Sequence, residues 1–277
     1  MSEQGANAAA GPIGRARGST WGDLYRAAVL GGVTIGFSAL GLAAAVLGGG
    51  QRFTWLAPRW ARIICRLCRV RVAVGGEPVP TEAPAYVVMA NHSSHFDVIA
   101  LYAGYPGDVR PVAKRELGWI PVFGWVLRAG AAIMIDRGDR KRATASIERA
   151  GQTIRGGRSV LMFPEGTRTP GGVVGPLKKG PFHLALAARV PILPIGIEGS
   201  GDVLPRKGWR IRPGVIRLRV GGPIPTSELR NGPAVRAQLS QRVRDALAEL
   251  SNGRLDPPDV PWVGSGQRAD PSRAPES

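Results

Sequence analysis

The sequence Ala85-Tyr86-Val87-Val88-Met89-Ala90-Asn91-His92-Ser93-Ser94-His95-Phe96-Asp97 joins an apolar run to a short polar turn. The apolar part, residues 86–90, predicts a buried strand, and residues 97–103 predict a helix directly after the turn. Ser94 and Asp97 have nearly the spacing of a capping box, which supports a helix start at this point. The stretch therefore predicts a strand, a turn and a helix, which are the building elements of an α/β fold.

The same alternation of strands and helices continues along the chain. Further strands are predicted over residues 110–113, 132–135, 159–163, 192–197 and 215–220. Further helices are predicted over residues 140–155, 181–188 and 233–250, the last of them with proline in its first turn. We therefore expect an α/β domain over residues 73–251 and a disordered, Pro- and Gly-rich tail over residues 252–277.

The composition favours an anionic partner. In 277 residues, 37 Lys and Arg exceed 20 Asp and Glu, which gives a formal net charge of +17 at pH 7. Such a surplus suits nucleic acid, an anionic membrane surface or a phosphorylated substrate. No nucleic-acid-binding module is recognisable and aromatic residues make up only 6%, so we expect no nucleic-acid partner. Cys65 and Cys68 lack a second ligand pair, and we interpret them as free thiols compatible with a reducing cytoplasm.

The N-terminal region predicts a membrane anchor. Residues 1–26 read as a disordered tail, and residues 27–50 carry no charged side chain. As a helix, this uncharged run is about 36 Å long and crosses a hydrocarbon core of about 30 Å. The anchor either spans the membrane or re-enters it, and a signal peptide is the alternative interpretation. More basic residues follow the anchor than precede it, which predicts a cell-membrane protein with its catalytic domain on the cytoplasmic side.

Residues 51–72 predict a basic amphipathic helix. Arg59, Arg62, Arg66 and Arg69 share one helical face, with apolar residues between them. Next to an anchor, this pattern predicts an interfacial helix that contacts anionic headgroups. The alternative is an ordinary helix whose apolar face packs into the core and whose basic face is solvated.

His92 and Asp97 are the candidate catalytic pair. An imidazole titrates near neutral pH, and a carboxylate fixes its tautomer and stabilises the imidazolium, so the pair suits a general base. Five residues apart, the two side chains meet if His92 lies in the turn and Asp97 in the first turn of the helix. The alternative is purely structural: Ser94 caps the helix, Asp97 completes the capping box, and His92 is an ordinary loop residue.

A second polar turn, Phe163-Pro164-Glu165-Gly166-Thr167-Arg168, follows a strand at the end where open α/β sheets bind ligands. Glycine permits close approach of a ligand, and Arg168 offers a planar fork for phosphate oxygens. A local Glu–Arg pair in a solvated turn is the alternative. Asp136 and Arg137 follow another strand, and Lys114 belongs to a further charged cluster. No G-x-S-x-G elbow, P-loop, dinucleotide fingerprint or H-E-x-x-H motif occurs, and we expect no metal.

Four blocks in this order resemble the 1-acylglycerol-3-phosphate acyltransferase family of glycerolipid acyltransferases. The blocks are N-H-x-S-x-x-D at 91–97, an apolar run ending in Ile135-Asp136-Arg137, F-P-E-G-T-R at 163–168, and V-P-I-x-P at 190–194. The resemblance covers about residues 55–222. Ala131 and Met134 depart from the glycine and the aromatic residue usual in the second block, which affects the expected acceptor pocket.

The resemblance implies a single acyltransferase domain with a central mixed sheet flanked by helices. It implies that His92 deprotonates the hydroxyl of a lysophospholipid, that Asp97 orients His92, and that acyl-CoA or acyl carrier protein donates the acyl group without a cofactor. Arg137, Arg168 and Lys114 would hold the acceptor phosphate, with Glu165 fixing the arginines. The implied substrate-binding residues are Asn91, Ser94, Lys114, Asp136, Arg137, Glu165, Gly166, Thr167 and Arg168.

Three alternatives to phosphatidic acid synthesis stay open at this point. The first is the same transfer to another lysophospholipid or hydroxylated lipid. The second is a catalytically inactive, membrane-tethered protein that binds lipid or nucleic acid. The third is a lipid hydrolase in which His92 activates water.

Overall fold

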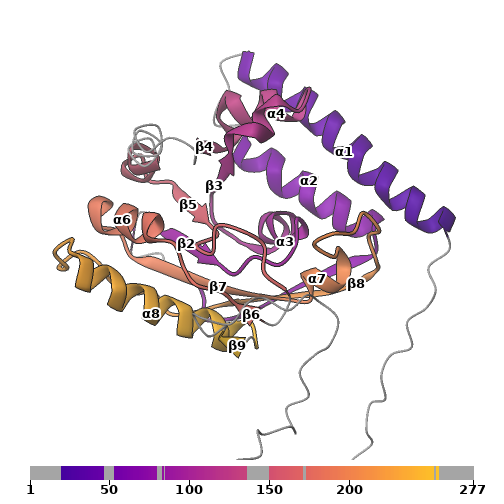
Figure 1. The fold of residues 1–277 in the computed structure, drawn as a ribbon. Helices are drawn as coiled ribbons and strands as arrows, with labels where there is room; N and C mark the ends of the chain where they lie inside the picture. Colours follow the sequence, from indigo (N-terminus) through magenta and orange to yellow (C-terminus); the bar gives the residue numbers. More distant parts are fainter. Residues whose placement is uncertain are drawn as a thin grey trace, which may run out of the picture.

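The computed structural model describes residues 20–46, 53–79, 83, 85–135, 150–170, 173–252 and 254–255. The chain forms an α/β domain with a long N-terminal helix along one side (Figure 1). In chain order the elements are α1 Thr20–Val46, α2 Phe53–Leu67, β1 Val70–Gly76, β2 Val87–Ala90, α3 Phe96–Gly104, β3 Val109–Lys114, η2 Arg115–Trp119, α4 Phe123–Val126, η3 Leu127–Ala131, β4 Ile133–Ile135, β5 Ser159–Met162, β6 Val173–Val174, α6 Lys179–Ala188, β7 Ile192–Glu198, α7 Ser200–Val203, β8 Gly214–Val220, α8 Pro233–Leu250 and β9 Arg254–Leu255.

A mixed seven-stranded sheet, in the order β1-β8-β7-β2-β5-β3-β4, forms the centre of the domain. Neighbouring strands run parallel except β7 and β8, which are antiparallel. In the middle, Val87 of β2 lies opposite Val160 of β5 and Ile192 of β7. The predicted α/β fold with a central mixed sheet is therefore confirmed.

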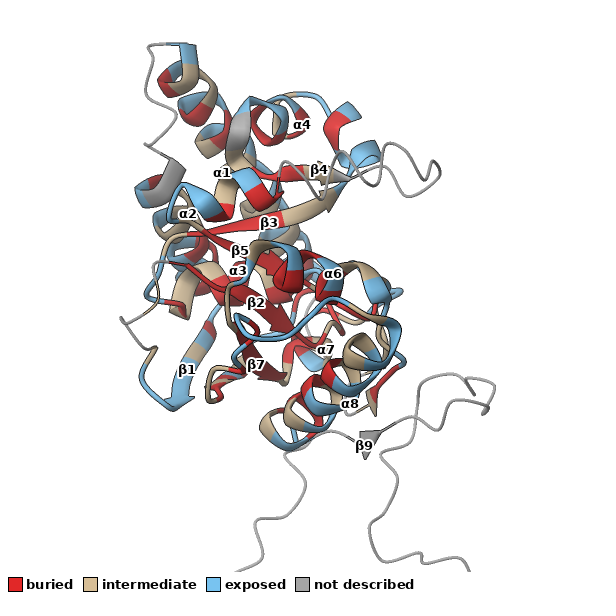
Figure 2. Cartoon of the chain, turned by 90° about the vertical axis from the view of Figure 1, so that its left-hand side faces the viewer, coloured by how far each residue is buried: buried red, intermediate tan, exposed pale blue. Residues whose placement is uncertain are grey.

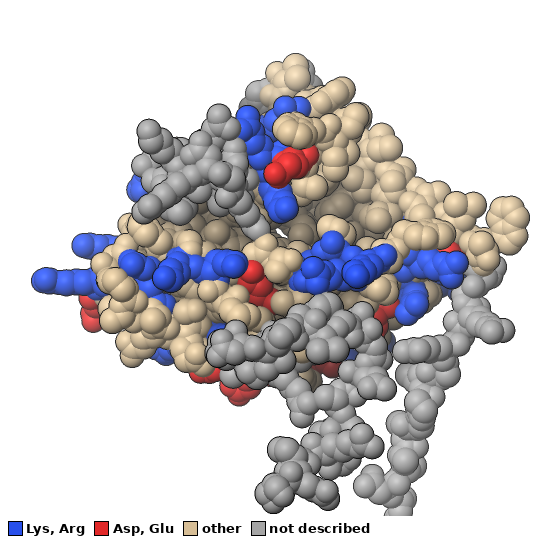
Figure 3. All heavy atoms as spheres, in the orientation of Figure 1, with Lys and Arg blue, Asp and Glu red and all other residues tan. Residues whose placement is uncertain are grey.

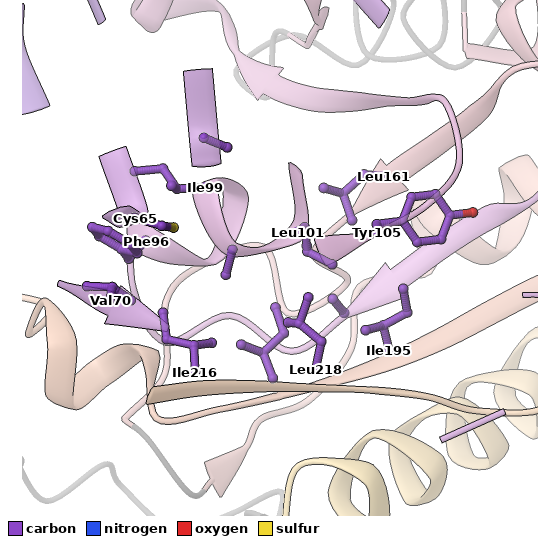
Figure 4. Close-up of a cluster of buried hydrophobic side chains, with 14 of the residues drawn as sticks. Cys65, Val70, Phe96, Ile99, Leu101, Tyr105, Leu161, Ile195, Ile216 and Leu218 are labelled. Carbon is purple, nitrogen blue, oxygen red and sulfur yellow. The ribbon is translucent and has the colours of Figure 1, made fainter. Parts of the chain in front are cut away.

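The apolar core has two parts, one on each face of the sheet. Side chains of a strand alternate between faces, so Val88 and Ala90 of β2 join one cluster, and Val87 and Met89 join the other. The first cluster includes residues of α2 and α3 (Figure 4). The second includes residues of α6 and α8. Because β2 and β7 are covered on both faces, they appear almost entirely buried in Figure 2 and read as continuous apolar runs in the sequence.

Helix α1 begins at Thr20, inside the region predicted to be a disordered tail, so that boundary was wrong. The helix is long and apolar enough to cross a membrane. It also lies against the domain beside α2 and α4 (Figure 1). Trp60 Nε1 of α2 donates a hydrogen bond to Thr34 Oγ1 at 3.1 Å, and Val29 and Leu30 pack against the first core cluster.

Helix α2 is shorter than predicted and is part of the core. It ends at Leu67, and β1 begins at Val70, so residues 70–72 belong to a strand and not to the predicted interfacial helix. Ala61, Ile64 and Cys65 of α2 are buried in the first core cluster. The apolar face of α2 therefore packs on the protein core, as the alternative interpretation expected. The sequence could not decide this, because the pattern of an amphipathic helix is the same on a membrane and on a protein core.

At the C-terminal end, Arg254–Leu255 form β9, which pairs with β6 inside the range predicted to be a disordered tail. The prediction for residues 256–277 lies outside the described residues. Of the helix predicted over residues 140–155, residues 150–155 are helical and residues 140–149 lie outside the described residues. The other predicted elements agree with the structure to within one or two residues at each end.

Candidate active site

Three parallel neighbours, β2, β5 and β7, bring polar loops together at their carboxyl ends. The turn after β2 carries residues 91–95, the turn after β5 carries residues 163–168, and β7 leads into Gly199 and α7. This is the edge of an open α/β sheet where ligands bind. The two polar turns that the sequence singled out therefore lie side by side.

His92 and Asp97 meet in a hydrogen bond: His92 Nδ1 lies 2.8 Å from Asp97 Oδ2. The same carboxylate oxygen accepts hydrogen bonds from the backbone N–H groups of Ser93 at 2.8 Å and Ser94 at 2.9 Å. The Asp97 side chain is completely buried, whereas the His92 side chain keeps 17% of its surface exposed. A carboxylate only accepts, so Nδ1 carries the hydrogen and the lone pair of Nε2 is left to take a proton.

The capping interpretation and the pairing interpretation of Asp97 both hold. The Asp97 carboxylate binds the N–H groups that precede α3, as a capping residue does, and from that position it also reaches His92. Ser94 contributes differently from the expected capping box, because its hydroxyl accepts from the N–H of Phe96 and not of Asp97.

The ring of Phe163 stacks on the ring of His92, with centroids 4.0 Å apart and planes 19° from parallel. The imidazole is thus held at one edge by a carboxylate and on one face by an aromatic ring. Phe163 is the first residue of the F-P-E-G-T-R motif, but no role is predicted for it from the sequence. Its place directly before the motif's polar residues, at the end of a strand next to β2, was the available signal.

Glu165 supports the turn of residues 91–95, the candidate catalytic turn, from inside the protein. Its buried carboxylate accepts hydrogen bonds from the N–H of His92 at 2.8 Å, from the N–H of Gly175 at 3.3 Å and from the hydroxyl of Thr169. Burial raises the pKa of Glu165, and these hydrogen bonds oppose the shift only in part. The expectation that Glu165 fixes Arg168 was wrong, because the carboxylate faces backbone groups and a hydroxyl.

Asn91 and Ser94, expected to bind substrate, have buried side chains that hold the turn in place. The amide of Asn91 donates to the carbonyl of Ile197 at 2.9 Å and accepts from its N–H at 2.7 Å. The hydroxyl of Ser94 donates to the carbonyl of Leu204 at 2.7 Å. Both partners lie more than a hundred residues away, so no local signal could reveal them.

Ser93 and Ser200, for which no role is predicted from the sequence, join the turn to α7. Their hydroxyl oxygens lie 2.8 Å apart, and Ser200 is completely buried. Together with the contacts of Asn91 and Ser94, this bond attaches the candidate catalytic turn to the segment that runs from β7 to Leu204.

Arg168 lies at the surface of the same region. Its Nη1 donates to the carbonyl of Arg206 at 2.9 Å, and its pKa is lowered first by burial and then by the charge of Arg206. Partial desolvation of the His95 imidazole lowers its pKa, and the charge of Arg168 lowers it further. Arg168 directly precedes Thr169, whose N–H donates to the carbonyl of His92 at 2.7 Å, so its guanidinium is close enough to this turn to suit an anionic substrate.

The remaining expected site residues are Gly166 and Thr167, Lys114, and Asp136 and Arg137. Thr167 is exposed, and Gly166 has a φ of 74°, so the turn itself requires glycine at this position. Lys114 is exposed at the end of β3, which is separated from β2 by β5. Asp136 and Arg137 lie outside the described residues. Within the described ranges, no group of three His, Cys, Asp or Glu side chains is placed to hold a metal ion.

The chain matches the model of the family named Acyltransferase over residues 71–198. A 1-acyl-sn-glycerol-3-phosphate acyltransferase from Pseudomonas aeruginosa is 34% identical over 210 residues, which cover 72% of this chain and 79% of that protein. The alpha enzyme of the same name from Ovis aries is 37% identical over 180 residues, which cover 64% of this chain and 62% of the relative. The chain belongs to the 1-acyl-sn-glycerol-3-phosphate acyltransferase family.

The fold also matches a solved structure. The crystal structure of the 1-acyl-sn-glycerophosphate acyltransferase from Thermotoga maritima superposes with a TM-score of 0.68 at 24% identity, covering 82% of this chain and 95% of that chain. Helix α1 and membership of this family are consistent with a membrane location.

Proposed function

We propose that this acyltransferase moves a fatty acyl group from acyl-CoA or acyl carrier protein to the free hydroxyl of 1-acylglycerol-3-phosphate, giving phosphatidic acid for phospholipid biosynthesis. The relatives from Pseudomonas aeruginosa and Ovis aries are named for this acceptor. The observation that carries the proposal is the hydrogen bond of 2.8 Å between His92 Nδ1 and Asp97 Oδ2, in a turn at the carboxyl ends of the parallel strands β2, β5 and β7.

In the proposed mechanism, His92 Nε2 takes the proton of the acceptor hydroxyl while the oxygen attacks the thioester carbonyl. The tetrahedral intermediate expels the thiolate, which receives the proton from the imidazolium of His92. Asp97 holds the tautomer and stabilises the positive charge that forms on His92. The ester forms directly, no acyl-enzyme intermediate is required, and no cofactor takes part.

The acceptor phosphate is assigned to Arg168, with Lys114 and Arg137 as further cations of the same site. Arg168 lies beside the catalytic turn, because the N–H of the next residue, Thr169, donates to the carbonyl of His92 at 2.7 Å. A guanidinium forms paired hydrogen bonds with phosphate oxygens, which a lone ammonium does not. Glu165 is excluded from this group because its carboxylate is occupied by His92, Thr169 and Gly175.

The proposal also covers where the enzyme acts, which is at the cytoplasmic face of the cell membrane. Helix α1 enters the cell membrane from one side without crossing it, because Arg26 near its start is hydrogen-bonded to Ile211 of the catalytic domain. The basic residues that follow α1 favour the cytoplasmic side for the catalytic domain. The acceptor is itself a membrane lipid, so an enzyme attached to the bilayer meets it without extracting it into water.

The test is thiol release from acyl-CoA by purified protein, with and without 1-acylglycerol-3-phosphate. Acceptor-dependent release is expected, and His92→Ala lowers it about 100- to 10,000-fold, the usual contribution of a general base. Asp97→Asn is expected to lower release as well, while both variants stay membrane-associated. His183→Ala is the matched control, because His183 is exposed on α6.

Three outcomes contradict the proposal. Near-normal turnover of His92→Ala refutes the mechanism. Release of free fatty acid without acceptor indicates a hydrolase. Faster acylation of another lysophospholipid from a lipid extract indicates a different acceptor.

A further inference from the structure

A short loop between α7 and β8 carries an unusual concentration of positive charge. Residues 205–213, here called the basic loop, read Pro-Arg-Lys-Gly-Trp-Arg-Ile-Arg-Pro and contain no acidic residue. Four cationic side chains and an indole of this loop are exposed: Arg206, Lys207, Trp209, Arg210 and Arg212. Trp209 keeps 56% of its surface exposed, although a large aromatic side chain is normally buried.

Polar contacts attach the basic loop to the first turns of α1. Arg26 Nε donates to the carbonyl of Ile211 at 2.6 Å, and Ile211 itself is fully buried. Asp23, which is buried, pairs with Arg26 at 2.9 Å and with Arg210 at 3.7 Å. The basic loop and the start of α1 are therefore one surface.

The start of α1 adds exposed apolar and aromatic side chains to this surface. Trp21 is 81% exposed, Leu24 54% and Tyr25 53%. Figure 3 shows Lys and Arg side chains in a band across this face, and the right-hand part of the band lies below the largely uncharged surface of α1. A band of cations beside exposed Trp and Tyr, next to a long apolar helix, is the pattern of a membrane–water interface.

We propose that the basic loop, together with the first turns of α1, binds the anionic headgroup layer of a phospholipid membrane. Lys207 and Arg212 contact lipid phosphates, and Trp209 enters the interface beside them. The apolar helix that begins at this surface selects a membrane over a nucleic acid or an acidic protein, which would share only the preference for positive charge.

The same loop is attached to the candidate active site. The hydroxyl of Ser94 donates to the carbonyl of Leu204 directly before the loop, and Arg168 donates to the carbonyl of Arg206 within it. A headgroup layer bound by the basic loop therefore lies next to the catalytic turn. This consequence rests on the proposed function, because it matters only if the acceptor is a membrane lipid, whereas headgroup binding itself does not depend on catalysis.

The experiment compares binding of the full-length protein to vesicles of phosphatidylcholine alone and of phosphatidylcholine with phosphatidylglycerol in equal parts. Helix α1 contributes to binding on both, so the preference for anionic vesicles reports the basic loop. Each cation near the surface strengthens such binding about fivefold, so the double variant Lys207→Gln, Arg212→Gln is expected to lose about 25-fold of the preference. Added salt reduces the preference of the wild type.

The matched control is the double variant Arg230→Gln, Arg242→Gln, which removes the same charge from exposed positions before and on α8. It is expected to keep the preference. Thiol release with a short-chain, water-soluble acceptor in detergent shows that the loop variant is folded, since Lys207 and Arg212 are outside the catalytic machinery. If the wild type releases no thiol at all, the proposed function is refuted. The vesicle assay still tests headgroup binding, because that assay does not depend on catalysis.

The proposal is overturned if the loop variant keeps the full preference for anionic vesicles or if the control variant loses it equally. It is also overturned if the wild type shows no preference between the two vesicles. If the wild type binds an oligonucleotide or acyl carrier protein but not anionic vesicles, the surface belongs to that partner instead.

Discussion

Replacing Glu165 by Gln separates support of the catalytic turn from binding of substrate. The carboxylate accepts from His92 N–H through one oxygen, and from Thr169 and Gly175 through the other. An amide has only one oxygen, so Glu165→Gln turns an NH₂ toward either the N–H of His92 or the N–H of Gly175. One buried N–H then lacks an acceptor, which costs about 1–3 kcal/mol.

For a domain of this size, that loss corresponds to a melting temperature lower by roughly 2–12 °C. We expect kcat to fall as well, because the N–H of His92 loses its fixed position, whereas KM for the acceptor stays nearly unchanged. Thermal unfolding in detergent and steady-state thiol release measure the two effects. Glu228→Gln makes the same chemical change at an exposed position and serves as the control.

The pH dependence of this stability difference gives an independent check. Burial raises the pKa of Glu165 above its ordinary 4.5, so the folded state binds the proton more tightly than the unfolded state does. The wild type therefore loses stability as pH rises from 4.5 through the raised pKa, and the Gln variant does not. The difference in the free energy of unfolding between the wild type and Glu165→Gln therefore becomes smaller as the pH rises over that range. A higher acceptor KM with unchanged kcat and unchanged melting temperature would refute this reasoning and return Glu165 to the substrate site.

Three further predictions concern other parts of the fold. Phe163→Leu removes the ring stacked on His92; kcat is expected to fall with little change in either KM, and an unchanged kcat would exclude a positioning role. Burial raises the pKa of Cys65 to about 12 and of Cys68 to about 11, so neither thiol reacts with a thiol reagent at pH 8 until the protein unfolds, and rapid labelling of the native protein would contradict their burial. A Cβ at Gly196 would lie within 2.5 Å of the backbone of α8, so Gly196→Ala is expected to destabilise the fold by about 1–3 kcal/mol, which equilibrium unfolding measures.

The sequence predicts the contacts that are local. Apolar runs locate β2, β5 and β7 because these strands are buried on both faces. His92 and Asp97 are predictable as a pair because a capping arrangement brings positions five apart together. Polar residues at the ends of neighbouring parallel strands were expected at one edge of the sheet, where the turn of Glu165 lies beside that of His92.

The contacts that the sequence did not reveal are those between distant segments. Asn91 and Ser94 appear in a functional motif without local partners, so they were assigned to substrate, although Ile197 and Leu204 satisfy them. For α2, a basic amphipathic pattern fits a membrane and a core equally, and only the position of α3 decides between them. Strand β1 was missed because most of its residues are not buried and it follows a helix after a turn at Arg69.

The pair of hydrogen bonds between the Asn91 side chain and the backbone of Ile197 affects when the site forms during synthesis. The two residues are 106 positions apart, and the bond between Ser94 and Leu204 closes a span of 110. During synthesis, the catalytic turn therefore leaves the ribosome long before the segment that holds it. Contacts of such separation form late, after the entropy of closing the loop is overcome. Acyl transfer activity should consequently emerge only with the last steps of folding, so that a partly synthesised chain reaches the membrane through α1 before it is able to act on lipids.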